Sequence, residues 1–405
     1  MIPELLAPAG DREKLLAALA FGGDAVYLSG SEFGMRQNAG NFDLDGLREA
    51  IRLCHERGVR VYVTVNTFPR NGEAERLPAY LEQLDDMRAD AVLAADLGVA
   101  GAVLRYAPHA ELHVSTQVSV SNYAAARAWH DLGARRVVLA RELTLDEIGE
   151  IRAKTPADLQ LECFVHGAMC MSYSGRCLLS SCLTGRDAGR GKCAQPCRWS
   201  YALCEEKRPG EYFPVEEAEG ESYILNSRDL RMIEHLPELI SAGVSSLKIE
   251  GRGKTAYYAA CITGAYRRAL DGIAREGSAW QCPPELAEET EKVSHRPYDT
   301  GFYFGAHDLQ ERRSAEYIRP WDMAALQLAP PEGCTASLLQ KNHFAPGDTL
   351  EWLIPRLPSA PARLLSLTDA DGIPVDAARH PHQHLTARFA DPVPAGAILR
   401  KKVSE

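Results

Sequence analysis

Residues 4–30, ELLAPAGDREKLLAALAFGGDAVYLSG, contain the repeating unit that decides the fold. The apolar run ELLAPAG, which ends in a turn, predicts a strand, and DAVYLSG predicts a second strand. Between them, Asp11 can cap a helix whose apolar face carries Leu15, Ala18 and Leu19. A strand, a helix and a second strand in this order are typical of a parallel sheet with helices outside it.

The same alternation continues along the chain. Further strand candidates lie at residues 59–66, 90–95, 111–116, 135–140, 159–165, 223–227 and 245–251, which makes nine in all. A closed (β/α)₈ barrel needs eight strands, so we expect one candidate to belong to a hairpin inserted around YALCEEKRPGEYF (201–213). A doubly wound open sheet is the competing fold, although no Gly-rich dinucleotide-binding motif follows the first strand.

The pattern changes towards the end of the chain. We expect residues 1–275 to form an α/β, TIM-barrel-like main domain that ends in a long helix, and 276–297 to form a linker with a short helix. Residues 298–405 consist of short runs punctuated by glycine and proline, which predicts a small β domain.

Charge and composition limit the classes of function. The net charge of −10 argues against a protein coated in basic charge for non-specific nucleic-acid binding. The start, MIPELLAPAG, lacks the basic segment of a secretion signal, and no stretch is long and apolar enough to cross a bilayer. We therefore expect a cytoplasmic protein without a membrane partner, whose thiols stay reduced.

Seven of the eleven cysteines lie in the segment 163–204. Four of them, Cys170, Cys177, Cys193 and Cys197, follow the pattern C-x6-C-x15-C-x3-C among polar and Gly-rich residues. Four thiolates can complete an iron–sulfur or a zinc site, and the spacing differs from the C-x2-C pairs of zinc ribbons. The alternative is a group of inert, buried thiols. We expect Cys163, Cys182 and Cys204 to pack or to remain free.

Several polar residues follow directly after predicted strands, where a barrel gathers its active site. Candidates for substrate binding are Arg36, Asn38, Asn66, Gln117, Arg141, Lys248 and Arg252. Together they describe a cationic, amide-lined pocket for a small carboxylate or a phosphate backbone. His166 and Glu250 are candidates for proton transfer, and a structural, hydrogen-bonded His166 is the alternative. The sequence contains no H-E-x-x-H, G-x-S-x-G or Walker A motif.

Many of these segments resemble peptidase family U32, the collagenase-like proteins. The resemblance is carried by ELLAPAG, DAVYLSG, FGMRQNAGNF, VYVTVNTF, ARELTLDEI, YILNSRDL and LKIEGRGK, and above all by FVHGAMCMSYSGRCLLSSCLTGRDAGRGKCAQPCRW. It runs from residue 2 to about residue 275 and resumes at TGFYFG and KNHFAPGDTLEW.

The resemblance implies a [4Fe-4S] cluster on Cys170, Cys177, Cys193 and Cys197. It is strongest to the branch that makes 5-hydroxyuridine at the tRNA wobble position with prephenate, a small dicarboxylate. A sister branch hydroxylates a cytidine in ribosomal RNA. Arg36, Arg141, Lys248 and Arg252 would then hold the carboxylate or an RNA phosphate. The resemblance also implies a small, β-barrel-like C-terminal domain. The alternatives are a hydroxylation factor that acts on ribosomal RNA or another substrate, a collagenase-like protease, and a non-catalytic scaffold whose cluster is structural.

Overall fold

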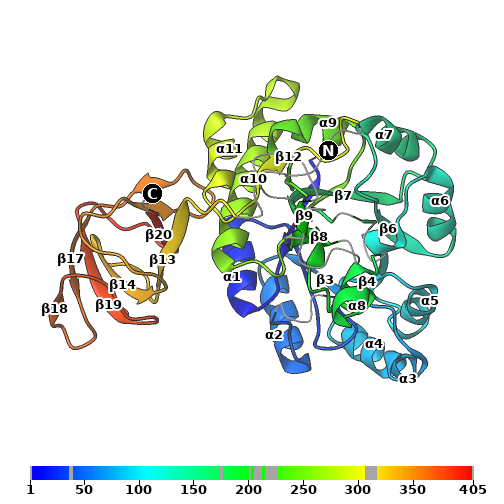
Figure 1. Ribbon diagram of the computed structural model, residues 1–405, viewed down its shortest axis with the longest axis horizontal. Coiled ribbons are helices and arrows are strands. Elements are labelled where there is room, and N and C mark those ends of the chain that lie inside the picture. The colour runs from blue at the N-terminus through cyan, green and yellow to red at the C-terminus, as the bar shows by residue number, and fades with distance from the viewer. Residues whose placement is uncertain are drawn as a thin grey trace.

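Eight parallel strands close into a barrel in the computed structural model, which describes residues 2–35, 40–170, 172–173, 177–199, 202–204, 212–214, 227–305 and 317–403 (Figure 1). The strands are β1 (Glu4–Pro8), β2 (Ala25–Leu28), β3 (Arg60–Val65), β4 (Ala91–Ala94), β5 (Glu111–Val114), β6 (Ala134–Val138), β7 (Gln160–Ala168) and β11 (Ser246–Ile249). β11 pairs in parallel with both β1 and β7, which closes the barrel. The predicted barrel is confirmed, and the competing open sheet is wrong.

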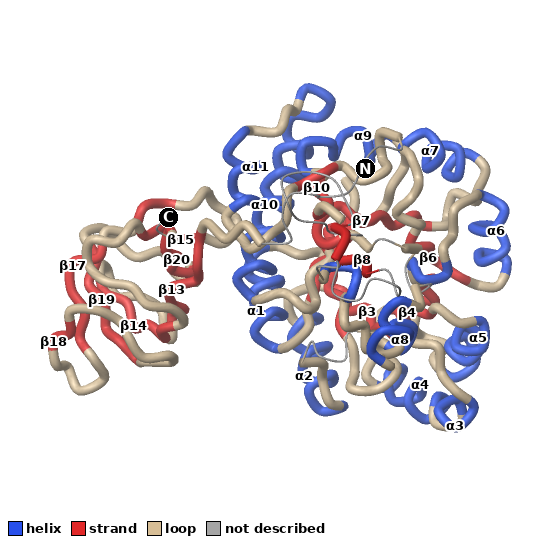
Figure 2. Tube along the Cα trace, viewed as in Figure 1, coloured by secondary structure: helices blue, strands red, loops and turns tan. Residues whose placement is uncertain are grey.

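The helices lie outside the ring of strands (Figure 2). They are α1 (Arg12–Phe21), α2 (Leu44–His55), α3 (Asn71–Ala74), α4 (Leu77–Asp86), α5 (Leu97–Tyr106), α6 (Tyr123–Asp131), α7 (Leu145–Ala153), α9 (Leu236–Ser241) and α10 (Ala256–Glu276). The predicted cap is present, since Asp11 accepts a hydrogen bond of 2.9 Å from the Lys14 N–H. No helix in the described part of the chain is long and apolar enough to span a membrane.

A long insertion separates β7 from β11. It contains α8 (Leu179–Thr184), the short 3₁₀ helices η2 (Ala188–Arg190) and η3 (Pro196–Arg198), β8 (Ala202–Cys204), β9 (Tyr212–Pro214), β10 (Asp229–Arg231) and η4 (Ile233–His235). β8 and β9 form an antiparallel pair, which confirms the inserted hairpin. The ninth strand candidate, 223–227, lies outside the described residues except for Ser227. β10 joins β7 in antiparallel orientation outside the barrel ring.

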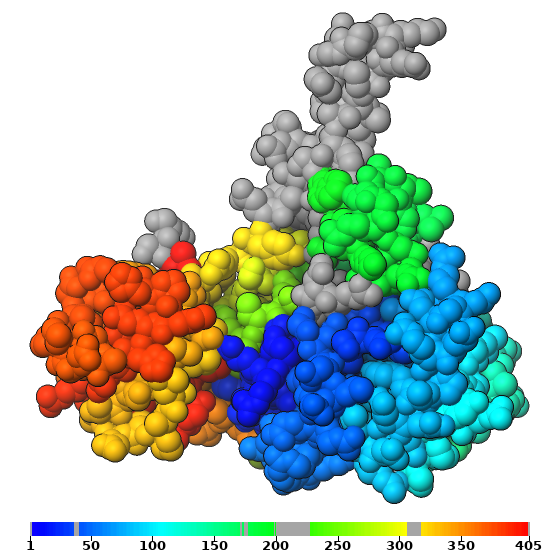
Figure 3. Space-filling view, turned by 90° about the horizontal axis from the view of Figure 1, so that it is seen from below, coloured from blue at the N-terminus to red at the C-terminus, as the bar shows by residue number. Residues whose placement is uncertain are grey.

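After α10, the short helices η5 (Gly277–Ala279) and α11 (Pro284–Glu291) lead to β12 (Tyr298–Asp299), which pairs with β10. An antiparallel sheet follows, built from β13 (Trp321–Gln327), β14 (Thr335–Gln340), β15 (Leu350–Leu353), β16 (Ala360–Pro361), β17 (Leu364–Thr368), β18 (Pro374–Val375), β19 (His384–Phe389) and β20 (Ile398–Lys402). Figure 3 shows this sheet, in orange and red, beside the blue start of the barrel.

A buried arginine connects this sheet to the barrel. Arg400 of β20 is fully buried, and its guanidinium donates to Glu289 of α11 (3.0 Å) and to Glu351 of β15 (2.6 Å). Lys292, just after α11, also pairs with Glu351 at 2.9 Å. Two cations and two carboxylates therefore meet at the junction, so each buried charge has a partner of opposite sign.

A second group of buried charges fills the amino-terminal half of the barrel. Arg136 of β6 contacts Glu4 of β1 at 2.7 Å and Glu162 of β7 at 3.0 Å, and its side chain is 1% exposed. The Ser246 hydroxyl lies within hydrogen-bond distance of both carboxylates, at 3.1 Å from Glu4 and 3.2 Å from Glu162, and can donate its one hydrogen to either. The other oxygen of Glu162 accepts from Lys248 Nζ at 2.8 Å. Lys248 lies two residues beyond Ser246 on β11, so Glu162 connects the charged layer to the carboxyl-terminal end of the barrel.

The charged layer predicts that substitutions of two neighbouring arginines change the free energy of unfolding by very different amounts. Arg136→Met should lower the free energy of unfolding by about 3–5 kcal/mol, because it removes the cation that the buried carboxylates of Glu4 and Glu162 share. Arg135→Met should leave the free energy almost unchanged, since Arg135 is 44% exposed and pairs only with the exposed Asp158. Urea unfolding of both variants measures the difference, and equal losses would contradict the role of Arg136.

The same layer predicts a pH dependence. Burial by itself would raise the pKa of Glu162, but Lys248 and Arg136 lower this pKa to about 2 from its ordinary 4.5. The stability from this carboxylate is therefore present above pH 4.5 and is lost as the pH falls towards 2.

Glu162→Gln should accordingly be less stable than the wild type at pH 7. The difference should shrink as the pH falls from 4.5 to 3, because the unfolded wild-type chain then binds a proton at Glu162 that the folded chain, with its pKa of about 2, does not yet bind. Urea unfolding at pH 7, 4.5 and 3 tests this, with the exposed Glu150→Gln as a matched control. A difference that stays constant with pH would contradict the prediction.

Candidate functional site

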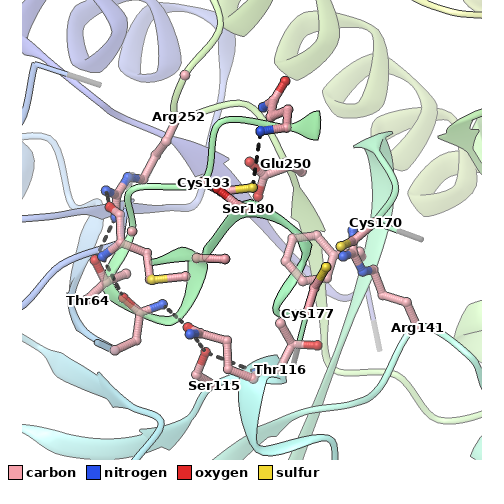
Figure 4. A pocket seen from close by; sticks show the side chains of 18 of the residues that line it. Thr64, Ser115, Thr116, Arg141, Cys170, Cys177, Ser180, Cys193, Glu250 and Arg252 are labelled. Carbon is pink, nitrogen blue, oxygen red and sulfur yellow. Dashed lines mark hydrogen bonds between the residues drawn. The ribbon is translucent and has the colours of Figure 1, made fainter. Parts of the chain in front are cut away.

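A cavity of about 380 Å³ lies at the carboxyl-terminal end of the barrel, between the strand ends and the inserted segment (Figure 4). Ten of the residues predicted for the site line it: Asn66, Gln117, Arg141, Lys248, Glu250, Arg252, Cys170, Cys177, Cys193 and Cys197. Arg36 and Asn38 lie outside the described residues. His166 is not among the lining residues.

The four cysteines of the quartet face this cavity from one side. Cys170 follows β7, Cys177 precedes α8, and Cys193 and Cys197 lie near η3. None of the four forms a disulfide with another described cysteine, and all four are exposed or half-buried. By contrast, burial raises the pKa of Cys54 and Cys163 to about 12, as expected of inert packed thiols.

The four thiols have the chemistry of a metal site, but they are not yet at metal-binding distances from one another. Four thiols on one cavity are the donor set of an iron–sulfur site. The N–H of Gln195 donates to Cys193 Sγ at 3.3 Å, a contact that stabilises a thiolate. In the part of the chain that the structure describes, no three His, Cys, Asp or Glu side chains are already gathered closely enough to hold a metal ion. The donors therefore fit, and a cluster would have to draw them together.

The cysteine segment (residues 177–199) is tied to the barrel rim. Arg190 of η2 forms a 2.5 Å ion pair with Glu73 of α3. A Cβ on Gly189 would lie 3.2 Å from the ring of Phe68, so the backbone approaches the rim closely here. Within the segment, the Ser180 hydroxyl accepts from the Ala194 N–H at 2.9 Å. The green residues of this segment stand above the blue part of the barrel in Figure 3.

Two amide side chains form a hydrogen-bonded row on the opposite wall. The backbone N–H of Met35 donates to Asn66 Oδ1 (3.1 Å), and Asn66 Nδ2 donates to Gln117 Oε1 (2.7 Å). The Ser115 hydroxyl also donates to Gln117 Oε1, at 3.3 Å. Asn66 follows β3 and Gln117 lies in the 3₁₀ helix η1 (Thr116–Val118) after β5. Dashed lines between Thr64 and Ser115 in Figure 4 mark this row.

The cations predicted for the pocket differ in their partners. Arg252 is 3% exposed and donates to Thr64 Oγ1 (2.6 Å), Asn41 Oδ1 (3.2 Å) and the Met35 carbonyl. It therefore holds the loop after β2 against β3. Arg141 donates to the Ala168 carbonyl at 3.0 Å.

Lys248 forms part of the cavity floor. Its ammonium pairs with Glu162 and lies 4.5 Å from the centre of the Tyr27 ring. The buried pair carries no net charge, so Arg141 and Arg252 supply most of the positive charge of the lining, against the single carboxylate of Glu250.

His166 lies behind the cavity wall, among tyrosines. Its ring nitrogens lie 3.3 Å from the hydroxyls of Tyr266 and Tyr298. Burial, with smaller contributions from Arg231 and other nearby cations, lowers the pKa of His166 well below its usual range. The imidazole is therefore neutral at pH 7, and its role in proton transfer stays a prediction.

The glycine after His166 is required by close packing. Gly167 has φ +106°, and a Cβ there would lie 2.4 Å from the Glu250 carbonyl oxygen. β7 and the segment after β11 can therefore meet only because residue 167 has no side chain.

Sequence reasoning missed several residues of the site. Thr64, Ser115 and Thr116 line the cavity at the same strand ends that predicted Asn66 and Gln117, so the same rule could have found them. Glu162 was missed as well, although a lone carboxylate inside the apolar run 159–165 indicates a buried cation partner.

Comparisons with known proteins agree on the family. Residues 10–313 match the model for "Peptidase family U32" and residues 321–400 match the model for its C-terminal domain. The chain is 37% identical over 402 residues to "tRNA hydroxylation protein P1" of Bacillus subtilis, covering 98% of this chain and 94% of that protein.

Two further relatives carry other names. The "Uncharacterized protease MJ0090" of Methanocaldococcus jannaschii is 41% identical over 317 residues, covering 78% of this chain and 75% of that protein. The "23S rRNA 5-hydroxycytidine C2501 synthase" of Escherichia coli is 37% identical over 300 residues, covering 72% of this chain and 44% of that protein. With a barrel, an antiparallel C-terminal sheet and both family matches in place, the chain belongs to peptidase family U32.

Proposed function

We propose that this protein is an iron–sulfur enzyme that hydroxylates the wobble uridine of tRNA to 5-hydroxyuridine, with prephenate as co-substrate. The observation that carries the proposal is that four cysteines and a set of cationic and amide side chains line one cavity. The tRNA hydroxylation protein of Bacillus subtilis, which resembles this chain over nearly its whole length, supports tRNA as the substrate.

In this proposal, Cys170, Cys177, Cys193 and Cys197 hold a [4Fe-4S] cluster. When bound, the cluster would supply redox or Lewis-acid chemistry beside the cavity. Ser180 and the Gln195 N–H support the loop that carries Cys193, through hydrogen bonds of 2.9 and 3.3 Å.

The side chains at the strand ends bind the organic substrate. Arg141 offers a guanidinium to a carboxylate, and Arg252 holds the loop that supports Asn66. Glu250 lines the same cavity and is the group we propose for moving a proton to or from the substrate. His166 is enclosed by tyrosine hydroxyls, so in this proposal it supports the wall behind the cavity.

The family name also raises proteolysis as an alternative. A thiol protease needs an imidazole within reach of its cysteine. Among the described residues, no histidine lines the cavity that holds the cysteine quartet. No specific observation therefore favours proteolysis over RNA hydroxylation.

The proposal predicts the metal content of the protein. Protein purified without oxygen should contain about four iron and four sulfide per chain and absorb broadly near 400 nm. Cys193→Ala should lose most of both, whereas Cys182→Ala should keep them, because Cys182 lies on α8 but does not line the cavity. Iron and acid-labile sulfide assays measure the result.

The same two variants test the reaction. In a strain that lacks the wobble modification, the wild-type gene and Cys182→Ala should restore 5-hydroxyuridine, and Cys193→Ala should leave it near background. Thermal melts separate loss of activity from loss of folding. Full restoration by Cys193→Ala, or zinc in place of iron, would contradict the proposed function.

A further inference from the structure

We infer that the side-chain N–H of Gln117 is a dedicated donor for a carboxylate oxygen of the small organic substrate, and that Asn66 is the residue that orients it. The inference deepens the proposed function, on which it rests for the choice of substrate. It assigns a binding atom within the cavity, which neither the family nor the names of the relatives specify.

The orientation of both amides follows from a backbone group. Because Met35 N–H can only donate, the atom of Asn66 that it contacts must be the oxygen. Asn66 therefore presents its NH₂ to Gln117, and the atom of Gln117 that receives it must in turn be the oxygen. The assignment of oxygen and nitrogen in Gln117 is thus decided by the chain itself.

This arrangement leaves one donor unused. Gln117 is 4% exposed, and its Nε2 is buried without a hydrogen-bond partner among the described residues. A buried amide N–H without a partner is unfavourable, and such groups usually have a ligand or water as partner. Gln117 is one of the residues that line the cavity, and we assign the missing partner to an acceptor atom of the molecule that binds there.

The positive charge around the Asn66–Gln117 row favours an anionic acceptor for the Gln117 N–H. The row begins at the Met35 N–H, and each of its two links donates towards Gln117. Hydrogen bonds aligned in one direction polarise one another, so the last N–H is a stronger donor than an isolated amide. Arg141 lines the same cavity. A terminal donor in a positive cavity favours an anionic oxygen, which points to a carboxylate.

Two variants distinguish the loss of the Gln117 donor from the addition of negative charge at the same position. Gln117→Met removes the donor without adding charge, and Gln117→Glu keeps the shape but replaces the donor with an anionic acceptor. Calorimetric titration with prephenate should give about 10-fold weaker binding for Gln117→Met and about 100-fold weaker binding for Gln117→Glu. Gln83→Glu, on the exposed face of α4, adds the same charge elsewhere and should bind as the wild type does.

Asn66→Asp tests the orienting role. The new carboxylate cannot donate to Gln117, so the Gln117 amide should turn its N–H towards this carboxylate and away from the substrate. With tRNA hydroxylation as the readout, KM for prephenate should rise about 10-fold while kcat and the melting temperature stay close to wild-type values. A merely structural role would lower the melting temperature and leave KM unchanged.

The outcomes are distinguishable. Wild-type binding by Gln117→Met, or no prephenate binding by the wild-type protein, overturns the inference. A change confined to KM for tRNA also overturns it, because the donor would then serve the base. If the wild-type protein binds prephenate and the variants weaken it as expected, the inference stands even when no tRNA is hydroxylated, and only the proposed function fails.

Discussion

The carboxylate of Glu162 is the interaction on which the rest of the barrel interior depends. One of its oxygens faces Arg136 in the amino-terminal layer, and the other faces Lys248 below the cavity. Glu162 is completely buried, so its loss would take one carboxylate partner from each of two buried cations. Through this one side chain, the charges that hold β1, β6, β7 and β11 together also set the floor of the functional site. Stability and site geometry are therefore coupled at the same residue.

The site itself has two halves of different origin. The amide row and the cations come from strand ends and from loops that the barrel holds rigidly, as the bonds of Arg252 to Thr64 and Asn41 illustrate. The cysteines come from an insertion after β7 that reaches the rim through Arg190 and Glu73. Such a division suits a reaction in which a fixed wall orients the organic substrate while the inserted segment supplies a metal centre.

The charge of the molecule agrees with this division. The chain carries a net charge of −10, yet the cavity is lined by three cations and one carboxylate. Of these cations, Lys248 is neutralised by Glu162, and Arg141 and Arg252 bind backbone carbonyls. The positive charge is thus local and oriented, which favours recognition of a small anion within the cavity over broad attraction of a polyanion along the surface.

The sequence by itself determined the strand and helix alternation, the cap at Asp11, the inserted hairpin and ten of the residues that line the cavity, because hydrophobic periodicity, capping and strand-end position are local properties. It also singled out the cysteine quartet by spacing. Only the tertiary structure decided that the sheet closes, since closure is the pairing of Ser246 on β11 with both Glu4 and Glu162. Only the structure enclosed His166 among tyrosines and paired Lys248 with Glu162, because both depend on contacts between distant strands and helices. The free donor of Gln117 likewise depends on Met35 and Asn66, which approach it only when the loops after β2, β3 and β5 fold onto one rim.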